Sequence, residues 1–166
     1  MGIVSFWILP DEEETAANVD AFLRGQIKRL ERQAGMKLIN LSSPQISGMP
    51  TSSTSSNRQE EKLQRGLNAT EALQAIRYTM ERTYGISPQL LIKYYIKEES
   101  VVKIRRDLLI DHNMFPKLKK NALCQFADCW EQTQNKYDWH DRDRIDLRVF
   151  PKQKLERNKE EIEEKK

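Results

Sequence analysis

Apolar residues recur at intervals of three and four along most of this chain, which is the spacing of one buried face of an α-helix. The first such stretch covers residues 11–35. Acidic residues crowd its start, where the helix dipole favours them, Thr15 is placed to cap it, and Gly35 is placed to end it. The pattern therefore predicts an amphipathic helix with a buried stripe of Val19, Phe22, Leu23, Ile27, Leu30 and Ala34.

Helical spacing returns in the second third of the chain and continues to about residue 130. Residues 57–84 form either one long helix or two helices with a break near residues 66–68, because two residue pairs have capping-box spacing: Asn57 with Glu60, and Asn68 with Glu71. A shorter helix is expected after Ser87, which can cap it, with Pro88 in the first position. Two more are expected over about 100–108 and 113–130, so five or six helices should account for the core.

Two short segments near the ends of the chain have β-prone patterns. Residues 3–9, "IVSFWIL", are mostly apolar, and residues 144–150, "RIDLRVF", alternate so that Ile145, Leu147 and Val149 lie on one side. These two segments could pair with each other. The fold class expected is therefore mainly α, and a short β-hairpin or small sheet from the terminal segments is left open.

A run rich in Ser and Thr interrupts the chain between the first and second helical stretches. Its sequence, "TSSTSSNR", carries no apolar side chain and is typical of a flexible linker. This run divides the chain into an N-terminal unit of a helix and an extended segment (1–50), the linker (51–58), a helical domain (59–139), and a short strand with a charged tail (140–166).

Positive charge is concentrated locally although the total is modest. The formal net charge is only +3, so composition alone does not indicate nucleic acid. The range from Arg24 to Lys37, however, contains five Lys and Arg residues and one acidic residue. The range from Lys103 to Lys120 contains six Lys and Arg residues and two acidic residues. Local excess of this kind is what phosphate binding needs. On the first helix the cations Arg24, Lys28, Arg29 and Arg32 are also consistent with an ordinary solvated face.

The residue pattern gives no support to catalysis or to a metal site. Cys124 and Cys129 are about 140° apart around one expected helix, so a bridge between them is not expected, and no further Cys completes a zinc set. His112 and His140 lack partners at the spacing of a catalytic triad or a metal site. We therefore expect a protein that is not an enzyme and that holds neither cofactor nor metal.

The expected compartment is the cytoplasm. The first residues, "MGIVSFWILP", lack the basic region of a signal peptide and reach Pro10 too soon for a membrane span. Two unpaired cysteines fit a reducing compartment. No membrane association is expected.

Residues 100–130 have the pattern of a helix-turn-helix, in which a second helix presents one free face to a DNA groove. Their apolar residues can form one inward set, and Asp111 or Asn113 can cap the second helix. The outward residues carry no negative charge: His112, Asn113, Lys117, Lys119, Lys120 and Asn121. Lys and Asn can reach both phosphates and base edges. Periodicity alone also permits two core helices with a basic surface.

The order of residues in this stretch is similar to the helix-turn-helix of sigma-factor region four. More closely, the chain resembles the ArpU family of phage-encoded transcriptional regulators, from about Asn18 to Trp130. The pieces that carry the resemblance are "NVDAFLRGQIKRLERQAG", "SPQISGMP", "NRQEEKL", "YYIKEE" and "ALCQFADCW".

The resemblance implies a sequence-specific DNA-binding regulator that activates late phage or prophage genes. Its partners would be double-stranded promoter or operator DNA and the bacterial RNA polymerase. By position, His112, Asn113 and Lys117 would face the bases. Contacts to the DNA backbone would come from Lys119, Lys120, Asn121, Lys103, Arg105 and Arg106.

Two residues depart from the usual helix-turn-helix pattern. Leu109 stands where the turn often has a small residue, and Pro116 stands where the motif usually has a polar side chain. Proline strains a helix interior but is tolerated in the first turn. The preferred arrangement therefore has Asn113 as the cap, with Pro116 in the first turn and His112 in the loop.

A second class of function remains open from the sequence. An amphipathic first helix, a flexible linker and a charged tail also suit an adaptor that binds RNA polymerase or another phage protein, with DNA contact incidental. Monomeric and dimeric binding are both compatible with this pattern.

Overall fold

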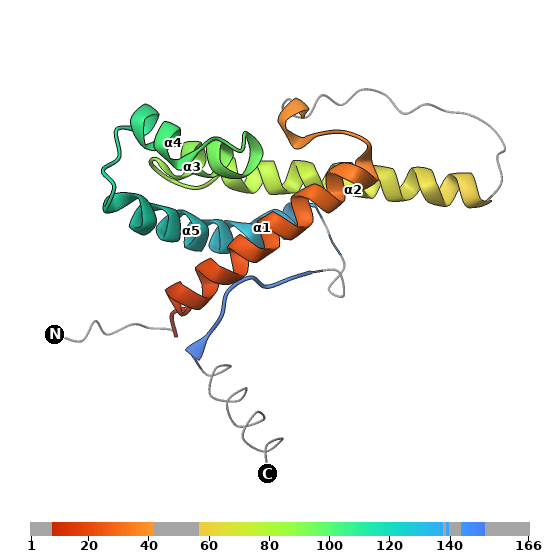
Figure 1. Ribbon diagram of the computed structural model, residues 1–166. Helices are drawn as coiled ribbons and strands as arrows, with labels where there is room; N and C mark the ends of the chain where they lie inside the picture. The colour runs from red at the N-terminus through yellow and green to blue at the C-terminus, as the bar shows by residue number, and fades with distance from the viewer. Residues whose placement is uncertain (1–7, 42–56, 138, 140–143, 152–166) are drawn as a thin grey trace, which may run out of the picture.

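The computed structural model describes residues 8–41, 57–137, 139 and 144–151. This part of the chain is mainly α-helical and contains no β-strand, which confirms the expected fold class (Figure 1). In chain order the elements are α1 (Glu12–Ala34), the 3-10 turn η1 (Leu38–Asn40), α2 (Asn57–Glu81), α3 (Ser87–Leu91), the π-helical turn η2 (Ile92–Ile96), α4 (Val101–Leu108) and α5 (Met114–Lys136).

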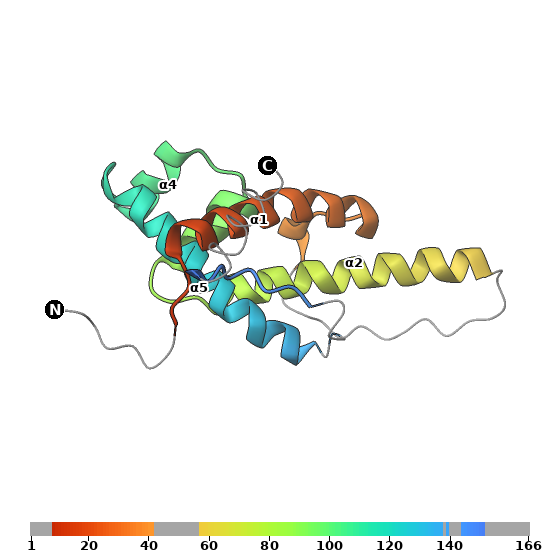
Figure 2. The same cartoon turned by 90° about the horizontal axis from the view of Figure 1, so that it is seen from below.

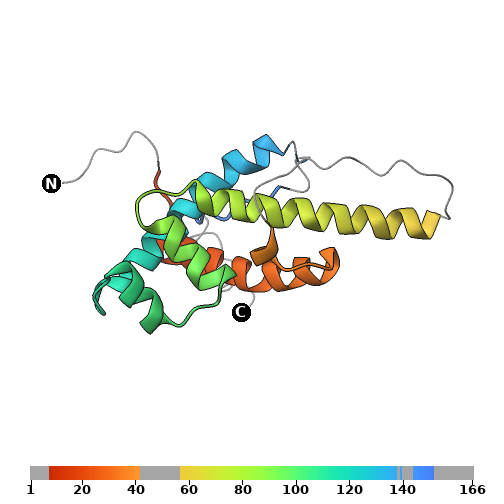
Figure 3. The same ribbon diagram turned by 90° about the horizontal axis from the view of Figure 1, so that it is seen from above.

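The body of the fold consists of α2 and α5, with α1 lying obliquely across them (Figure 1). Helices α2 and α5 run in opposite directions. Thr79 of α2 bonds to Thr133 of α5, whereas Tyr84, which comes later in the chain, bonds to Gln125, which comes earlier in α5. The first turns of α2 extend past the other helices, and α4 lies at the opposite end of the molecule (Figures 2 and 3).

Local signals explain where α1 begins and ends. Asp11 accepts a hydrogen bond from the Glu14 amide at 2.9 Å and so caps the helix, and the acidic first turn adds a favourable charge–dipole interaction. The prediction that Thr15 is the cap is wrong, because Thr15 is the fourth residue of α1 and its side chain is buried. Gly35 ends the helix as predicted, with a positive φ of 67° that a glycine adopts without strain.

One hydrophobic core joins α1 to the helices that lie beyond residue 57. Val19, Leu23 and Ile27 are buried as the spacing predicted, and they pack with residues of α2 and α5 such as Met80 and Phe126. The first helix therefore lies in the same core as the predicted DNA-binding helices. Most of the predicted linker, 51–58, falls outside the described residues, and α2 begins at its seventh residue.

The long helix α2 is continuous from Asn57 to Glu81, which is the first of the two alternatives that the capping-box pairs left open. Gly66 does not break it, and the Gly66 carbonyl accepts a hydrogen bond from the Thr70 hydroxyl at 3.0 Å. Gly85, with a φ of 62°, lies beyond the end of the helix and turns the chain towards α3.

A second, smaller cluster docks α4 onto its neighbours. Leu90 of α3, Ile104 of α4 and Phe115 of α5 meet there with Ile110 from the connection. Partly buried residues complete it: Ile86, Tyr94, Leu108 and Leu118. Residues from several segments therefore hold the short helix α4 in place, although eight residues alone would not form a stable helix.

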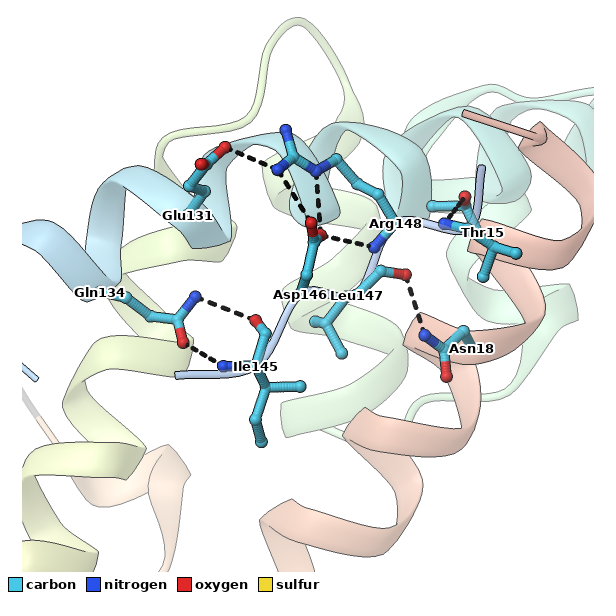
Figure 4. A network of polar contacts seen from close by, with 9 residues as sticks. Thr15, Asn18, Glu131, Gln134, Ile145, Asp146, Leu147 and Arg148 are labelled. Carbon is cyan, nitrogen blue, oxygen red and sulfur yellow. Dashed lines mark hydrogen bonds and ion pairs between the residues drawn. The ribbon is translucent and has the colours of Figure 1, made fainter. Parts of the chain in front are cut away.

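The predicted C-terminal strand does not form, and its proposed partner, residues 3–9, lies mostly outside the described residues. Residues 144–150 are extended but pair with helices instead of a strand (Figure 4). The Gln134 amide donates to the Ile145 carbonyl at 3.0 Å and accepts from its N–H at 2.7 Å, and Asn18 donates to the Leu147 carbonyl at 2.9 Å.

The backbone N–H and carbonyl of Val149, next to the start of α1, also have hydrogen-bond partners. Thr15 accepts from the Val149 N–H at 3.0 Å, and the Asp11 N–H donates to the Val149 carbonyl at 2.7 Å. Leu147 and Val149 are buried, whereas Ile145 is exposed. Helix side chains therefore replace the ladder of a strand partner, and the segment ties the start of α1 to α5.

Replacing Gln134 by Leu should lower the free energy of unfolding by about 1–3 kcal/mol, because the Ile145 N–H and carbonyl would lose both partners. Urea unfolding measured by circular dichroism reports this change. Gln132→Leu is the matched control, since Gln132 is exposed on the same helix, and it should shift stability by less than about 0.5 kcal/mol. Equal effects of the two variants would contradict the assigned role of Gln134.

Candidate nucleic-acid interface

The connection between α4 and α5 consists of residues 109–113. Ser100 caps α4 as predicted, accepting from the Lys103 amide at 3.3 Å. Leu109 comes directly after α4 with φ 54° and ψ 43°, a left-handed conformation that small residues adopt more readily. Its side chain is 92% exposed. This conformation explains why a small residue is usual at such a position.

The start of α5 matches the preferred arrangement. Asn113 occupies the cap position, although its side chain makes no capping bond, and Pro116 is the third residue of the helix. The Asp111 carbonyl accepts from the amides of Met114 and Phe115 at 3.2 and 3.1 Å. His112 is exposed in the connection. The proline therefore costs the helix no interior hydrogen bond.

Four of the residues assigned to DNA are exposed around the first two turns of α5. His112 and Asn113 precede the helix, and Lys117 and Asn121 lie one turn apart on its outer face. Among the described residues, Lys117 has no carboxylate partner. We call these four side chains the free polar face.

Lys119 and Lys120 are placed differently, because both contact α1. Lys119 lies 3.2 Å from the Asp20 carboxylate, its ammonium is 4.2 Å from the centre of the Tyr94 ring, and its side chain is only 20% exposed. Lys120 lies 2.7 Å from the Glu13 carboxylate. Both lysines are therefore paired with carboxylates of α1, unlike Lys117.

Asp20 is the centre of the contact between α1, η2 and α5. It accepts hydrogen bonds from Arg24 at 2.8 Å and from the Tyr95 hydroxyl, in addition to its pair with Lys119. Partial burial would raise the pKa of Asp20, but hydrogen bonds from these three residues outweigh it and lower that pKa. The carboxylate thus stays ionised, and Arg24 also donates to the Tyr94 hydroxyl at 2.8 Å.

The cationic side chains of α4 differ in their exposure and in their ion pairs. Arg106 has a side chain that is 76% exposed, with Asp107 at 3.7 Å, whereas Lys103 pairs with Glu99 at 3.1 Å. Arg105 is partly buried, and its Nε has no hydrogen-bond partner among the described residues. Arg106 is therefore the cation of α4 that is best placed for a partner outside the protein.

Little in the sequence indicates the contacts that α1 makes with α5. Asp20 and Arg24 have the spacing of a helix pair, but nothing local shows that Asp20 also meets Lys119 from a segment 99 residues away. The sequence places Glu13 in a dipole-favoured first turn and indicates no partner for it. Only the packing of α1 against α5 brings these groups together.

The described residues also include both cysteines of the chain. Cys124 and Cys129 are free thiols, and burial raises the pKa of Cys124 to about 11, so its reactive thiolate form is scarce at neutral pH. No group of three potential metal ligands occurs in this part of the chain. None of its helices combines the length and apolar character that a membrane crossing requires.

Comparison with known proteins supplies one informative relative. No protein-family model and no solved structure matches the chain. The chain is 27% identical over 123 residues to an Enterococcus hirae protein named "Putative autolysin regulatory protein ArpU", a match that covers 73% of this chain and 89% of that protein. The match covers most of the chain, agrees with the resemblance to the ArpU family and fits a regulatory role.

Proposed function

We propose that this protein is a sequence-specific DNA-binding transcriptional regulator, a phage or prophage late-gene activator that acts with host RNA polymerase. The observation that carries the proposal is the free polar face on the first turns of α5, held out by the docked helix α4. A helix-turn-helix protein needs such a helix to enter the major groove. The late-gene role rests on the ArpU resemblance.

The exposed residues divide by what they can reach. Lys117 and Asn121 project from the helix and suit base edges, since Lys can bind guanine and Asn can bind adenine. His112 and Asn113 precede the helix and Arg106 comes from α4, so these three suit phosphates, which exchanges the roles that the resemblance implied for His112, Asn113 and Asn121. Lys103 can join them if it leaves Glu99, whereas Lys119 is held by Asp20 and Tyr94 and serves to position α5.

Salt dependence tests the proposal directly. Fluorescence anisotropy can measure binding to duplex DNA taken from upstream of the late genes of the phage or prophage. A plot of the logarithm of the binding constant against the logarithm of the salt concentration should have a slope of about −4 to −5, if about five phosphates are neutralised. Footprinting on the same DNA should reveal a protected site, and its length would report one or two half-sites. An adaptor would retain DNA weakly and without sequence preference, and that result would refute the proposal.

Glu13→Gln should strengthen binding to every DNA sequence. The substitution frees Lys120 from its 2.7 Å ion pair, so one more cation can neutralise a phosphate. The salt slope should steepen by about 0.9 unit, with little change in preference for the specific site. Anisotropy titrations on specific and random duplexes at several salt concentrations measure both quantities.

Glu81→Gln provides the matched control for this prediction. It removes the same charge and breaks the ion pair of Arg77 on α2, although the Arg77 guanidinium still donates to the Leu41 carbonyl. Its effect on the slope should be smaller because Arg77 lies on a different helix from the free polar face. Equal steepening in both variants would indicate a bulk charge effect and would argue against a phosphate near Lys120.

A further inference from the structure

A second cationic surface lies where the end of α2 meets the end of α5. Arg82 donates to the Tyr78 hydroxyl at 3.0 Å, and its guanidinium carbon is 5.4 Å from the centre of the Tyr78 ring. The Lys136 ammonium lies 3.7 Å from the same ring centre. Two cations from different parts of the chain therefore converge on one phenol. We refer to Tyr78, Arg82, Lys136 and Tyr137 as the α2–α5 patch.

The two cations of this patch form no ion pair within the described part of the chain, and the neighbouring Glu71 carboxylate accepts instead from the Trp139 indole N–H at 3.4 Å. Neither Arg82 nor Lys136 has a carboxylate partner there, in contrast to Lys119 and Lys120, and both are exposed. A hydrogen bond from Arg82, with Lys136 beside it, lowers the pKa of Tyr78. Both observations indicate a site with a preference for negative charge.

The patch is also aromatic. The Tyr137 ring meets Tyr78 edge-on with centres 6.5 Å apart, and Trp139 adjoins Tyr137 at 6.1 Å. Arginine and aromatic side chains are enriched where proteins bind each other, because they combine apolar area with hydrogen bonding. The same surface therefore offers both charge and contact area.

The position of the patch separates it from the free polar face. Lys117 and Lys136 lie on the same helix, 19 residues apart, which corresponds to about 28 Å along its axis. Figure 1 shows α5 running from the α4 end of the molecule back along α2. A partner on the patch and DNA at the start of α5 would therefore not compete for the same side chains.

We propose that the α2–α5 patch binds an acidic segment of a partner protein. Carboxylates would pair with Arg82 and Lys136, and apolar side chains of the segment would lie against Tyr137 and Trp139. A single-stranded nucleic acid fits less well, since base stacking needs open ring faces and cations already lie over the Tyr78 ring. The inference does not depend on DNA binding by α5.

The test uses a fluorescein-labelled peptide of Glu and Tyr residues, with a Gln-for-Glu peptide as the neutral comparison. The double variant Arg82→Gln/Lys136→Gln should bind the acidic peptide about tenfold more weakly than the parent protein, since two exposed ion pairs would be lost. Arg29→Gln/Arg32→Gln is the matched control, because it removes two exposed cations from α1 and should leave peptide affinity within about twofold.

A second readout reports on the patch itself. Bound carboxylates should raise the lowered pKa of Tyr78, seen as the difference between ultraviolet titrations of the parent protein and Tyr78→Phe, with and without peptide. Equal weakening by the two double variants would overturn the proposal, as would equal binding of the neutral peptide. The proposal would also be overturned if Arg82→Gln/Lys136→Gln bound random DNA duplexes more weakly but kept its affinity for the acidic peptide. That result would assign the patch to nucleic acid.

Discussion

Ile104→Ala should lower the free energy of unfolding by about 2–5 kcal/mol and remove specific DNA binding. Ile104 is fully buried at the centre of the cluster that docks α4, where it meets Leu90 and Phe115. Truncation leaves a cavity in the smaller core of the molecule, and α4 has few other contacts to compensate. Urea unfolding measures the stability, and amide hydrogen exchange shows whether α4 opens before the rest.

Val102→Ala is the control for this variant. Val102 lies on the same helix with its side chain 72% exposed, so its truncation should change stability by less than about 0.5 kcal/mol. Loss of DNA binding in Ile104→Ala with hydrogen exchange of α4 unchanged would contradict the link between docking and recognition. Unchanged stability would show that the second cluster does not hold α4.

Lys117→Ala should cost about 1–3 kcal/mol on the specific site and relax base preference there. Lys117 is exposed on the outer face of α5 and, among the described residues, has no carboxylate to release before it binds DNA. Binding to random DNA should fall much less, because only one phosphate-attracting charge is lost. Anisotropy on specific and random duplexes at one salt concentration measures the difference.

Lys37→Ala serves as the comparison, because Lys37 is an exposed lysine beyond the end of α1. It removes the same charge and should alter specific and random binding by similar, small amounts. If Lys117→Ala weakened both kinds of DNA equally, the residue would contact phosphate, and the assignment of Lys117 to a base edge would be wrong.

The helices could be predicted from the chain because their signals are local. The stripe of α1 and the stop at Gly35 depend on residues within one or two turns of each other. The same holds for Ser100 as the cap of α4 and for Pro116 in the first turn of α5. Side-chain spacing and backbone preference decide such features before any tertiary contact forms.

Predictions that needed a partner from elsewhere in the chain were less successful. Thr15 has the chemistry of a cap, but Asp11 takes that role and Thr15 bonds to the extended segment near the C-terminus. That segment alternates like a strand, and alternation reports only an extended chain with one buried side. Whether a strand or a pair of helices covers it depends on packing.

The sequence by itself determined a mainly helical protein with locally concentrated positive charge and an outward polar face at the start of α5. The tertiary structure alone decided which cations of that helix are free. Lys117 and Lys120 are the same residue type on one helix, yet only Lys120 of the two meets an acid from α1 in the described part of the chain. Helical spacing fixes the direction of a side chain around its own axis, whereas its charge partner depends on which distant helix packs beside it.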